Sequence, residues 1–458
     1  MKEITKKDIE EYQKSYAKYP LARSLSNVLA KTNLKDIVFC QKGMGQAHFH
    51  FSVDVKTLPV TNQKQSGRCW IFSALNVLRE EVAKKCKLDK FELSQNYVAF
   101  WDKYEKINYF LETMIELMTD GEDGLTKNER LITYLLDTGI QDGGQWDMFV
   151  NVVTKYGVVP KTAMEETFQS SHTPTMNRTI NSKLRRYAAK VAKCVREAQN
   201  GNCKPKKRDE KLAALAESMR KEMYTFLCEC FGEPATTFDF EYVDKDKKYH
   251  VDRKLTPKSF YKKYVCIDLV KDYVSIVNSP TADKPFYKNI TIDYLGNVVG
   301  GNRVQYLNLP MDEMKDLIVR QLKNGSVVWF GSDVSLKGDR EAGIWSEACF
   351  DYEGTLGMKF EMSKEDRLNF RESAMNHAMV ITGVNLDEKG QPTRWKIQNS
   401  WGEDRGEKGF YLMDAKWFDN YVFQAVVKKE FLSKEQLNYL EDEPNHYMPW
   451  DPMGTLAQ

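Results

Sequence analysis

The chain has 458 residues, of which 42% are hydrophobic and 12% are aromatic, so it can form a sizeable core and is not globally disordered. Its 67 Lys and Arg residues nearly balance 65 Asp and Glu residues, and a net charge of +2 argues against a globally basic nucleic-acid binder. No apolar run approaches the length of a membrane span, and the N-terminus lacks the apolar core of a secretory signal. We therefore expect a cytoplasmic protein with no membrane partner.

The cysteines support the same expectation. There are nine of them, an odd number at irregular spacing, which is typical of reduced thiols and not of a disulfide framework. Cys228 and Cys230 form a single C-x-C with no second pair, so we expect no zinc site.

Helices are predicted for most of the first half. Residues 1–30 are predicted to form a polar helix and residues 45–60 a strand, because the latter alternate apolar and polar side chains. From Cys69 onward, apolar residues recur at helical spacing, and Gly67 permits a tight turn into this helix. More helix is expected to about residue 230.

Residues 183–211 are strongly basic. They contain eleven Lys and Arg residues against three acidic ones, so the local net charge is 11 − 3 = +8. Two interpretations stay open: a solvated helical face, or a patch that lines a channel or binds polyanions such as nucleic acid.

Strands are predicted for the second half. Strand-like runs occur at 262–310, a helix is expected at 311–324, a buried strand at 327–330, and residues 376–429 are again rich in strand patterns. Helices followed by strands indicate an α+β fold and not βαβ alternation. The tail, residues 441–458, contains three prolines and no periodicity, which predicts an extended ending.

Four residues in these elements suggest nucleophilic catalysis. Cys69 lies at a predicted helix start, where the helix dipole favours the thiolate. The side-chain amide of Gln63 can lie beside the Cys69 backbone N–H and complete an oxyanion hole. His377 opens a strand and can exchange protons with the thiol, while Asn399, at the end of the next strand, can orient the imidazole. Trp401 can shield that hydrogen bond from water. Each residue alone could be structural, but their order and contexts together indicate acyl transfer.

The arrangement Q-x5-C-W, then a strand His, then N-S-W-G resembles the papain-like cysteine peptidases. Asp142-Gly143-Gly144 resembles the glycine pair of that family's first domain, which implies that Gly143 and Gly144 bind substrate. The segments QKQSGRCW, TPKSFY, YLGNVVGG, VWFGSDV, AMNHAMV, QNSWGEDRGEKGF and PWDPMGTLAQ resemble, more narrowly, the bleomycin hydrolase and aminopeptidase C family, from about residue 5 to the end.

This resemblance implies a papain-like fold with a helical first half, a β-barrel-like second half and large helical insertions. Cys69 and His377 are 308 residues apart, which requires such insertions. We expect a lead-in segment at 1–60, a helical domain with Cys69 at 61–180, and an inserted, mostly helical basic region at 181–262. A β domain with His377 and Asn399 should follow at 263–435, and a C-terminal arm at 436–458.

The resemblance further implies a cytosolic aminopeptidase that acts on peptides, assembles as a homohexamer around an internal channel, and needs no metal or organic cofactor. In that family the arm lies along the cleft, and its terminal carboxylate meets the substrate ammonium. Here this carboxylate belongs to Gln458, or to Ala457 where Gln458 has been trimmed. Two other interpretations stay open. One is a papain-like endopeptidase with a displaced tail, and the other is a hexameric nucleic-acid-binding protein with secondary peptidase activity.

Overall fold

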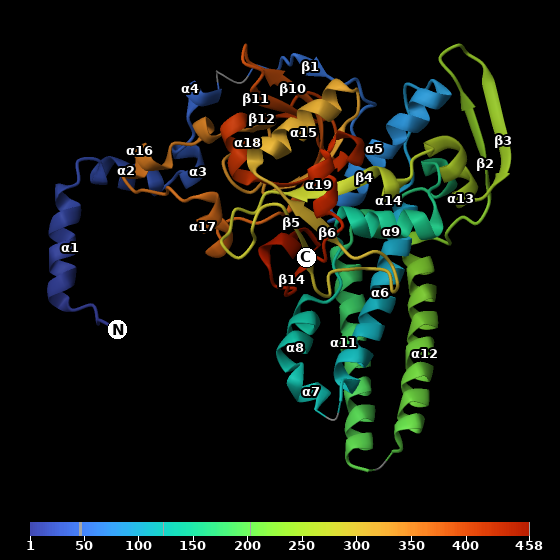
Figure 1. Ribbon diagram of the computed structural model, residues 1–458. Helices are drawn as coiled ribbons and strands as arrows, with labels where there is room; N and C mark the ends of the chain where they lie inside the picture. The colour runs from blue at the N-terminus through green and yellow to red at the C-terminus, as the bar shows by residue number, and fades with distance from the viewer. Residues whose placement is uncertain (45–47, 122, 202, 458) are drawn as a thin grey trace.

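The computed structural model describes residues 1–458 except 45–47, 122, 202 and 458. It confirms the predicted α+β organisation, with helices concentrated in the first half of the chain and strands in the second (Figure 1). The two halves meet where α5 (Cys69–Cys86) packs against β10 (His377–Leu386), and this contact positions the site described below.

The N-terminal segment differs from the prediction of one helix over residues 1–30. It contains α1 (Lys6–Lys18), α2 (Ala22–Leu29), α3 (Leu34–Ile37), α4 (Gln41–Met44) and β1 (Val53–Asp54). The break between α1 and α2 falls at Pro20, because proline lacks an N–H and disfavours helical backbone in the residue before it. The predicted strand over 45–60 reduces to β1, and residues 45–47 lie outside the described residues. In Figure 1, α1 lies apart from the body of the molecule, and none of its residues is buried.

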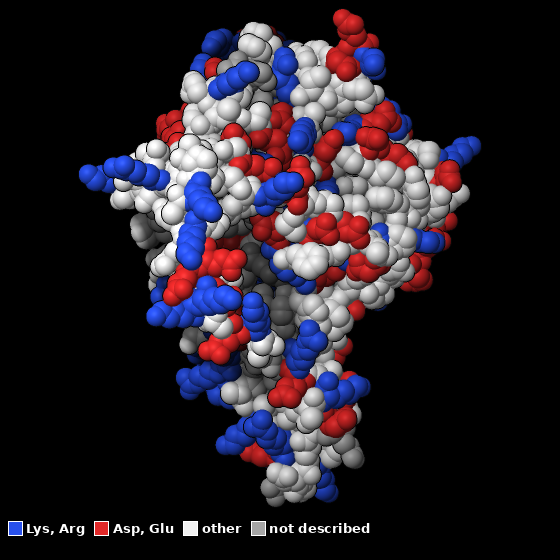
Figure 2. Space-filling view, turned by 90° about the vertical axis from the view of Figure 1, so that its left-hand side faces the viewer, with Lys and Arg blue, Asp and Glu red and all other residues white. Residues whose placement is uncertain are grey.

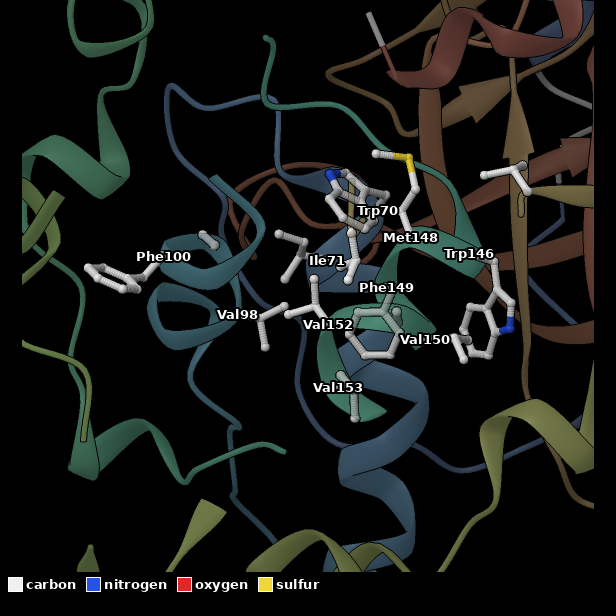
Figure 3. Close-up of a cluster of buried hydrophobic side chains, with 14 of the residues drawn as sticks. Trp70, Ile71, Val98, Phe100, Trp146, Met148, Phe149, Val150, Val152 and Val153 are labelled. Atoms are coloured by element: carbon white, nitrogen blue, oxygen red, sulfur yellow. The ribbon is translucent and has the colours of Figure 1, made fainter. Parts of the chain in front are cut away.

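The first half is helical, as predicted, and its main helix begins at Cys69. Its elements are α5 (Cys69–Cys86), α6 (Gln95–Thr119), α7 (Gly124–Lys127), α8 (Glu129–Thr138), α9 (Trp146–Tyr156), η1 (Lys161–Ala163), α10 (Phe168–Ser171), α11 (Pro174–Gln199) and α12 (Pro205–Phe231). Apolar side chains of α5, α6 and α9 meet in the core shown in Figure 3, where Ile71, Phe100 and Phe149 are buried. Burial of such side chains is the main stabilising contribution in a domain of this size.

A long helical hairpin, α11 and α12, projects from this half and packs along α6 (Figure 1). The predicted domain boundary at residue 181 falls inside α11. The basic segment 183–211 spans the tip of this hairpin, and Figure 2 shows basic and acidic side chains interspersed on the projection. The region predicted as mostly helical also contains a hairpin of β2 (Phe238–Val243) and β3 (Tyr249–Leu255).

Between the halves, the run at 264–270 that was predicted as strand consists of the end of one helical turn, a short irregular link and the start of another helix. It lies in η2 (Tyr261–Val265), a π-helical turn, and α14 (Leu269–Asp272), which follow α13 (Pro257–Phe260). Cys266 ends η2 with a left-handed backbone, and the Asp268 side chain accepts a hydrogen bond from the Lys271 N–H as the cap of α14. These local turns override the apolar pattern of the segment.

The described residues of the second half build most of a sheet of twelve strands, ordered β14-β5-β6-β4-β13-β7-β10-β11-β12-β9-β8, with β1 beside β10. The remaining strands are β4 (Tyr273–Val277), β5 (Lys288–Ile292), β6 (Gln305–Asn308), β7 (Val328–Ser332), β8 (Gly338–Asp339), β9 (Ile344–Trp345), β11 (Pro392–Gln398), β12 (Phe410–Asp414), β13 (Val422–Lys428) and β14 (Asn445–Tyr447). The helices and short helical turns of this half are α15 (Met311–Lys323), η3 (Glu347–Cys349), α16 (Tyr352–Leu356), α17 (Lys364–Asn369), α18 (Ala415–Tyr421), η4 (Lys429–Phe431) and α19 (Lys434–Tyr439).

The tail is not wholly extended as predicted. After β14, which pairs in parallel with β5, the chain forms the 3-10 turn η5 (Pro452–Ala457). Among the described residues, no helix is long and apolar enough to cross a membrane.

Candidate active site

The predicted nucleophile lies at the interface of the two halves. Cys69 is the first residue of α5, and its side chain is buried, with 4% exposure. The backbone N–H of Ala378 points at its sulfur at 3.4 Å, and one turn further along α5 the Ser73 hydroxyl donates to the Ala378 carbonyl at 2.9 Å. These bonds fix the start of α5 against the start of β10, so Cys69 is next to His377 in space although 308 residues separate them in sequence.

His377 forms a hydrogen bond with Asn399 and a ring contact with Trp401. Its Nε2 lies 2.9 Å from Oδ1 of Asn399, which follows the last residue of β11. Trp401 lies against the imidazole, with ring centroids 4.7 Å apart, and both His377 and Asn399 are buried. This bond assigns the proton on Nε2 to the side facing Asn399 and leaves Nδ1 as the nitrogen that can exchange a proton.

Gln63 joins the two loops of the site. Its backbone N–H donates to the Ser400 carbonyl at 2.8 Å, and its side-chain oxygen accepts from the Ser400 hydroxyl at 2.7 Å. Its side-chain nitrogen donates to the carbonyl of Ser66, three residues before Cys69, at 2.6 Å. A primary amide carries two N–H groups, and this bond uses one of them. Gln63 thus aligns the loop before the nucleophile with the loop after Asn399.

Burial sets the charge state of the catalytic pair. It raises the pKa of the Cys69 thiol to about 11, and the backbone N–H groups of Ala378, Trp70 and Cys69 itself act in the opposite direction. Burial also lowers the pKa of His377 to about 4, although the hydrogen bond that His377 donates to Asn399 acts in the opposite direction. Both shifts favour a neutral thiol and a neutral imidazole, so burial opposes the thiolate that we predicted from the helix dipole.

Asp142 belongs to the predicted Asp142-Gly143-Gly144 motif, but the sequence did not indicate that this residue anchors the loop before Cys69. Its carboxylate accepts from the Gly67 N–H at 3.0 Å, from Asn177 at 2.9 Å and from the hydroxyl of Thr173, and it pairs with Lys103 at 2.7 Å. Lys103 and Asp142 are buried, and their interaction holds the pKa of Asp142 well below its usual range despite that burial. One feature of the sequence could have indicated this ion pair: Lys103 stands among apolar residues at a core position of α6.

The two predicted glycines are required by close contacts. A Cβ at Gly144 would lie 2.6 Å from the Trp70 ring, and a Cβ at Gly143 would overlap the carbonyl oxygen of Leu456. The Lys106 ammonium donates to the Gly143 carbonyl at 2.6 Å and forms an ion pair with Asp102 at 2.8 Å. Gly143 therefore lies directly against the C-terminal turn, while Gly144 permits the packing of the residue that follows Cys69.

The C-terminal turn lies between the two halves of the cleft. The Thr455 hydroxyl donates to the carbonyl of Met375, two residues before His377, at 2.8 Å, and Leu456 is buried beside Gly331 and Gly143. Ala457 is half-buried at the end of η5, whereas Gln458 lies outside the described residues.

Contacts further back attach this arm to the body. Trp450 packs against Tyr134 and under the guanidinium of Arg130, and Asp451 forms an ion pair with Lys284 at 2.8 Å. Within the described residues, no group of three or more His, Cys, Asp or Glu is arranged to hold a metal ion.

Comparison with known proteins identifies the family. Residues 3–454 match the model of the Peptidase C1-like family. The chain is 43% identical to aminopeptidase C of Listeria innocua, over 99% of both chains, and 40% identical to bleomycin hydrolase of Rattus norvegicus, over 89% of this chain and 88% of the relative. The crystal structure of PepW from Lactobacillus rhamnosis HN001 superposes with a TM-score of 0.93 at 43% identity, over 99% of both chains.

These relatives confirm the predicted family, fold and enzyme class, a papain-like cysteine aminopeptidase. The structure places Cys69 against Ala378, which follows His377, and joins His377 to Asn399 by a hydrogen bond, an arrangement compatible with that class. The chain belongs to the Peptidase C1-like family.

Proposed function

We propose that this cysteine aminopeptidase removes single residues from the N-termini of peptides because its own C-terminal arm closes one side of the cleft. The observation that carries the proposal is the position of η5. Its buried Leu456 lies against Gly143, on the loop that borders the site, and its Thr455 is bonded two residues before His377. Extended substrate chain cannot occupy the same space, so the first residue of a peptide would lie next to Cys69.

The chemistry follows from the residues at the junction. The Cys69 sulfur attacks the carbonyl carbon of the first peptide bond as its proton passes to His377. The oxygen of the resulting tetrahedral intermediate is negatively charged, and the Cys69 N–H and the second N–H of Gln63 are the donors we assign to it. His377 then protonates the leaving amine and the C–N bond breaks, which leaves a thioester. Water, deprotonated by His377, attacks the thioester and releases the first residue and the free thiol.

The substrate ammonium is the group that the arm would recognise. A terminal carboxylate on Ala457 or Gln458 can accept an ion pair from it, whereas a blocked N-terminus offers no charge and needs more space. Each free N-terminus would thus be both bound and positioned by the end of the chain.

The test compares aminoacyl-coumarin amides with their N-acetylated counterparts on the full-length protein. We expect cleavage of the free-amine compounds and near-zero cleavage of the acetylated ones. Equal rates on both sets would support the alternative, an endopeptidase whose tail is displaced. The attachments of Trp450 and Asp451 weigh against that alternative, since each must be broken to free the arm.

The predicted assembly stays a proposal. We propose a homohexamer, supported by apolar side chains that the single chain leaves exposed on its N-terminal segment: Ile4 is 68% exposed, Tyr12 57% and Tyr16 58%. Tyr12 and Tyr16 lie one turn apart on α1, which has no buried residue, and Ile4 lies just before this helix. Exposed apolar groups gathered in this way are typical of surfaces that meet a partner. Light scattering at micromolar concentration should give about six times the 53.2 kDa of one chain, and a monomeric mass would contradict it.

Two further expectations also stay proposals. The basic segment 183–211 on the α11–α12 hairpin would give weak, salt-dependent affinity for nucleic acid, which a DNA-binding assay at two salt concentrations tests. A cytoplasmic location, expected from the cysteine pattern, can be tested by fractionation of cells that express the protein.

A further inference from the structure

A cavity of about 640 Å³ lies between the loop that precedes Cys69 and the loop that contacts the C-terminal turn. It is lined by residues 64–67, 141–143, 173–174, 177–178 and 181. Gly67, two residues before Cys69, forms one wall, and Gly143, which contacts the C-terminal turn, forms another. In an N-terminal residue one Cα separates the ammonium from the scissile carbonyl. With the carbonyl at Cys69 and the ammonium at the arm, the side chain on that Cα enters the space next to both.

Most residues that line this cavity can form hydrogen bonds through their side chains. Nine of its twelve residues carry polar or charged side chains, and the other three are two glycines and Pro174. Hydrogen-bonding side chains such as Gln65, Gln141 and Asn181 favour a first residue that is itself polar.

The charge of the cavity is positive. Its one carboxylate, Asp142, is already paired with Lys103 and accepts three further hydrogen bonds. Its two cations, Lys64 and Arg178, are exposed and form no ion pair within the described part of the chain. An anionic group in the cavity would therefore find unpaired positive charge and no free carboxylate.

We propose that this cavity selects the first residue of the substrate and prefers acidic side chains, with glutamate favoured over glutamine of equal size and over lysine. The inference rests on the proposed aminopeptidase function and adds a substrate class to it. The cations that carry the preference are Lys64, on the loop before the nucleophile, and Arg178, in the first turns of α11.

The experiment measures kcat/KM for glutamyl-, glutaminyl-, leucyl- and lysyl-coumarin amides on one preparation of the full-length protein. The ratio of glutamyl to glutaminyl rates should be about 5-fold, as for two partly exposed ion pairs, and should fall as salt screens them. Because it is a ratio within one preparation, it does not depend on the fraction of folded enzyme.

Substitution then assigns the effect. Lys64→Gln combined with Arg178→Gln should bring the ratio close to one, whereas Arg186→Gln, an exposed charge on the same helix away from the cavity, should leave it at the wild-type value. A wild-type ratio of one or less, or a ratio that the double variant does not change, overturns the inference. If free-amine compounds are all cleaved in such a case, the proposed function still stands; if only blocked or internal bonds are cleaved, the proposed function falls as well.

Discussion

The hydroxyl of Thr455, three residues before the last residue of the chain, donates a hydrogen bond of 2.8 Å to the carbonyl of Met375, which lies two residues before His377. On its other side the same turn contacts Gly143, on the loop that Asp142 ties to Gly67. The turn η5 is therefore in contact with both halves of the site, and this arrangement makes the arm the most direct target for experiment.

Deleting residues 455–458 should remove the terminal carboxylate and the block together, without touching Cys69. Cleavage of free-amine substrates should fall, because an ion pair in a partly buried cleft contributes about 1–3 kcal/mol. Cleavage of N-acetylated or internal bonds should rise from near zero. Steady-state kinetics on both substrate sets measure the change. An unchanged preference for free N-termini would contradict the proposal that the arm sets this specificity.

Replacing the nucleophile with Cys69→Ala should lower kcat by about 10⁴ or more and leave the fold intact. Thiol labelling gives a second measurement. Cys266 is exposed and should react with iodoacetamide without loss of activity, whereas modification of the buried Cys69 should abolish it. Mass spectrometry of the labelled peptides against residual activity separates the two, and full activity with Cys69 alkylated would disprove its role.

The supporting amides should differ in their effects. Gln63→Ala should lower kcat by about 10²–10³, the range for one oxyanion donor. Asn399→Ala should cost less than His377→Ala, because it removes the orientation of the imidazole and leaves the proton carrier in place. The three variants are compared by kcat on one substrate, and an unchanged rate in Gln63→Ala would remove this side chain from the oxyanion hole.

The pH dependence of kcat/KM should have an unusually low acid limb. Burial lowers the pKa of His377 to about 4, so the imidazole should stay neutral and active well below its ordinary value of 6.5. With free-amine substrates the alkaline limb should follow the substrate ammonium, near pH ~8, since the pKa of Cys69 is raised to about 11. Profiles from pH 4 to 10 test this, and an acid limb at 6.5 or above would contradict the buried, neutral imidazole.

The lowered pKa of His377 also predicts that the protein becomes less stable as the pH falls. Because the pKa of His377 is lower in the folded state than its ordinary 6.5, the unfolded chain binds this proton more readily between about pH 6.5 and 4. The contribution of the neutral His377 imidazole to the free energy of unfolding is therefore lost as the pH falls through that range. Urea unfolding at pH 7 and pH 5 should show a larger loss for the wild type than for His377→Asn, and equal losses would argue against the shift.

The buried Lys103–Asp142 ion pair should stabilise the whole fold as well as hold the loop before Cys69. Asp142→Ala leaves the buried Lys103 ammonium without its carboxylate partner, although its hydrogen bonds to Asn177 and the Gln141 carbonyl can remain, and the loss of such a charge pair costs about 3–5 kcal/mol of unfolding free energy. Lys221→Ala, which removes an exposed pair with Glu217, is the matched control and should cost at most about 1 kcal/mol. Denaturant midpoints report both, and similar costs would show that the Asp142 pair is not the anchor described above.

The parts of the site that could be predicted are those fixed by local pattern. Helical spacing after Cys69 and the strand pattern after His377 placed both residues at element starts, where the structure has them. The position of Asn399 at the end of a strand was likewise predicted from the strand pattern of the residues before it. In each case neighbouring residues in sequence determine the local geometry, so the pattern is sufficient.

The parts that could not be predicted depend on distant partners or on single turns. The Lys103–Asp142 pair joins residues 39 apart on different elements, and no periodicity records it. The apolar run at 264–270 forms helical turns because the Asp268 cap and the left-handed Cys266 decide the local backbone. The tail lacks periodicity because Trp450, Met453 and Leu456 pack into separate contacts, and not along one face.

The attachment of the arm through β14 and the Asp451–Lys284 pair has a consequence for how the enzyme would respond to its surroundings. A blocking segment carried on the same chain acts at a high and constant local concentration, which dilution does not change. The restriction of the cleft would therefore be an intramolecular equilibrium. Long peptides could relax it only by competing with a tethered ligand, and the restriction would be the same in a dilute assay as in a crowded cell.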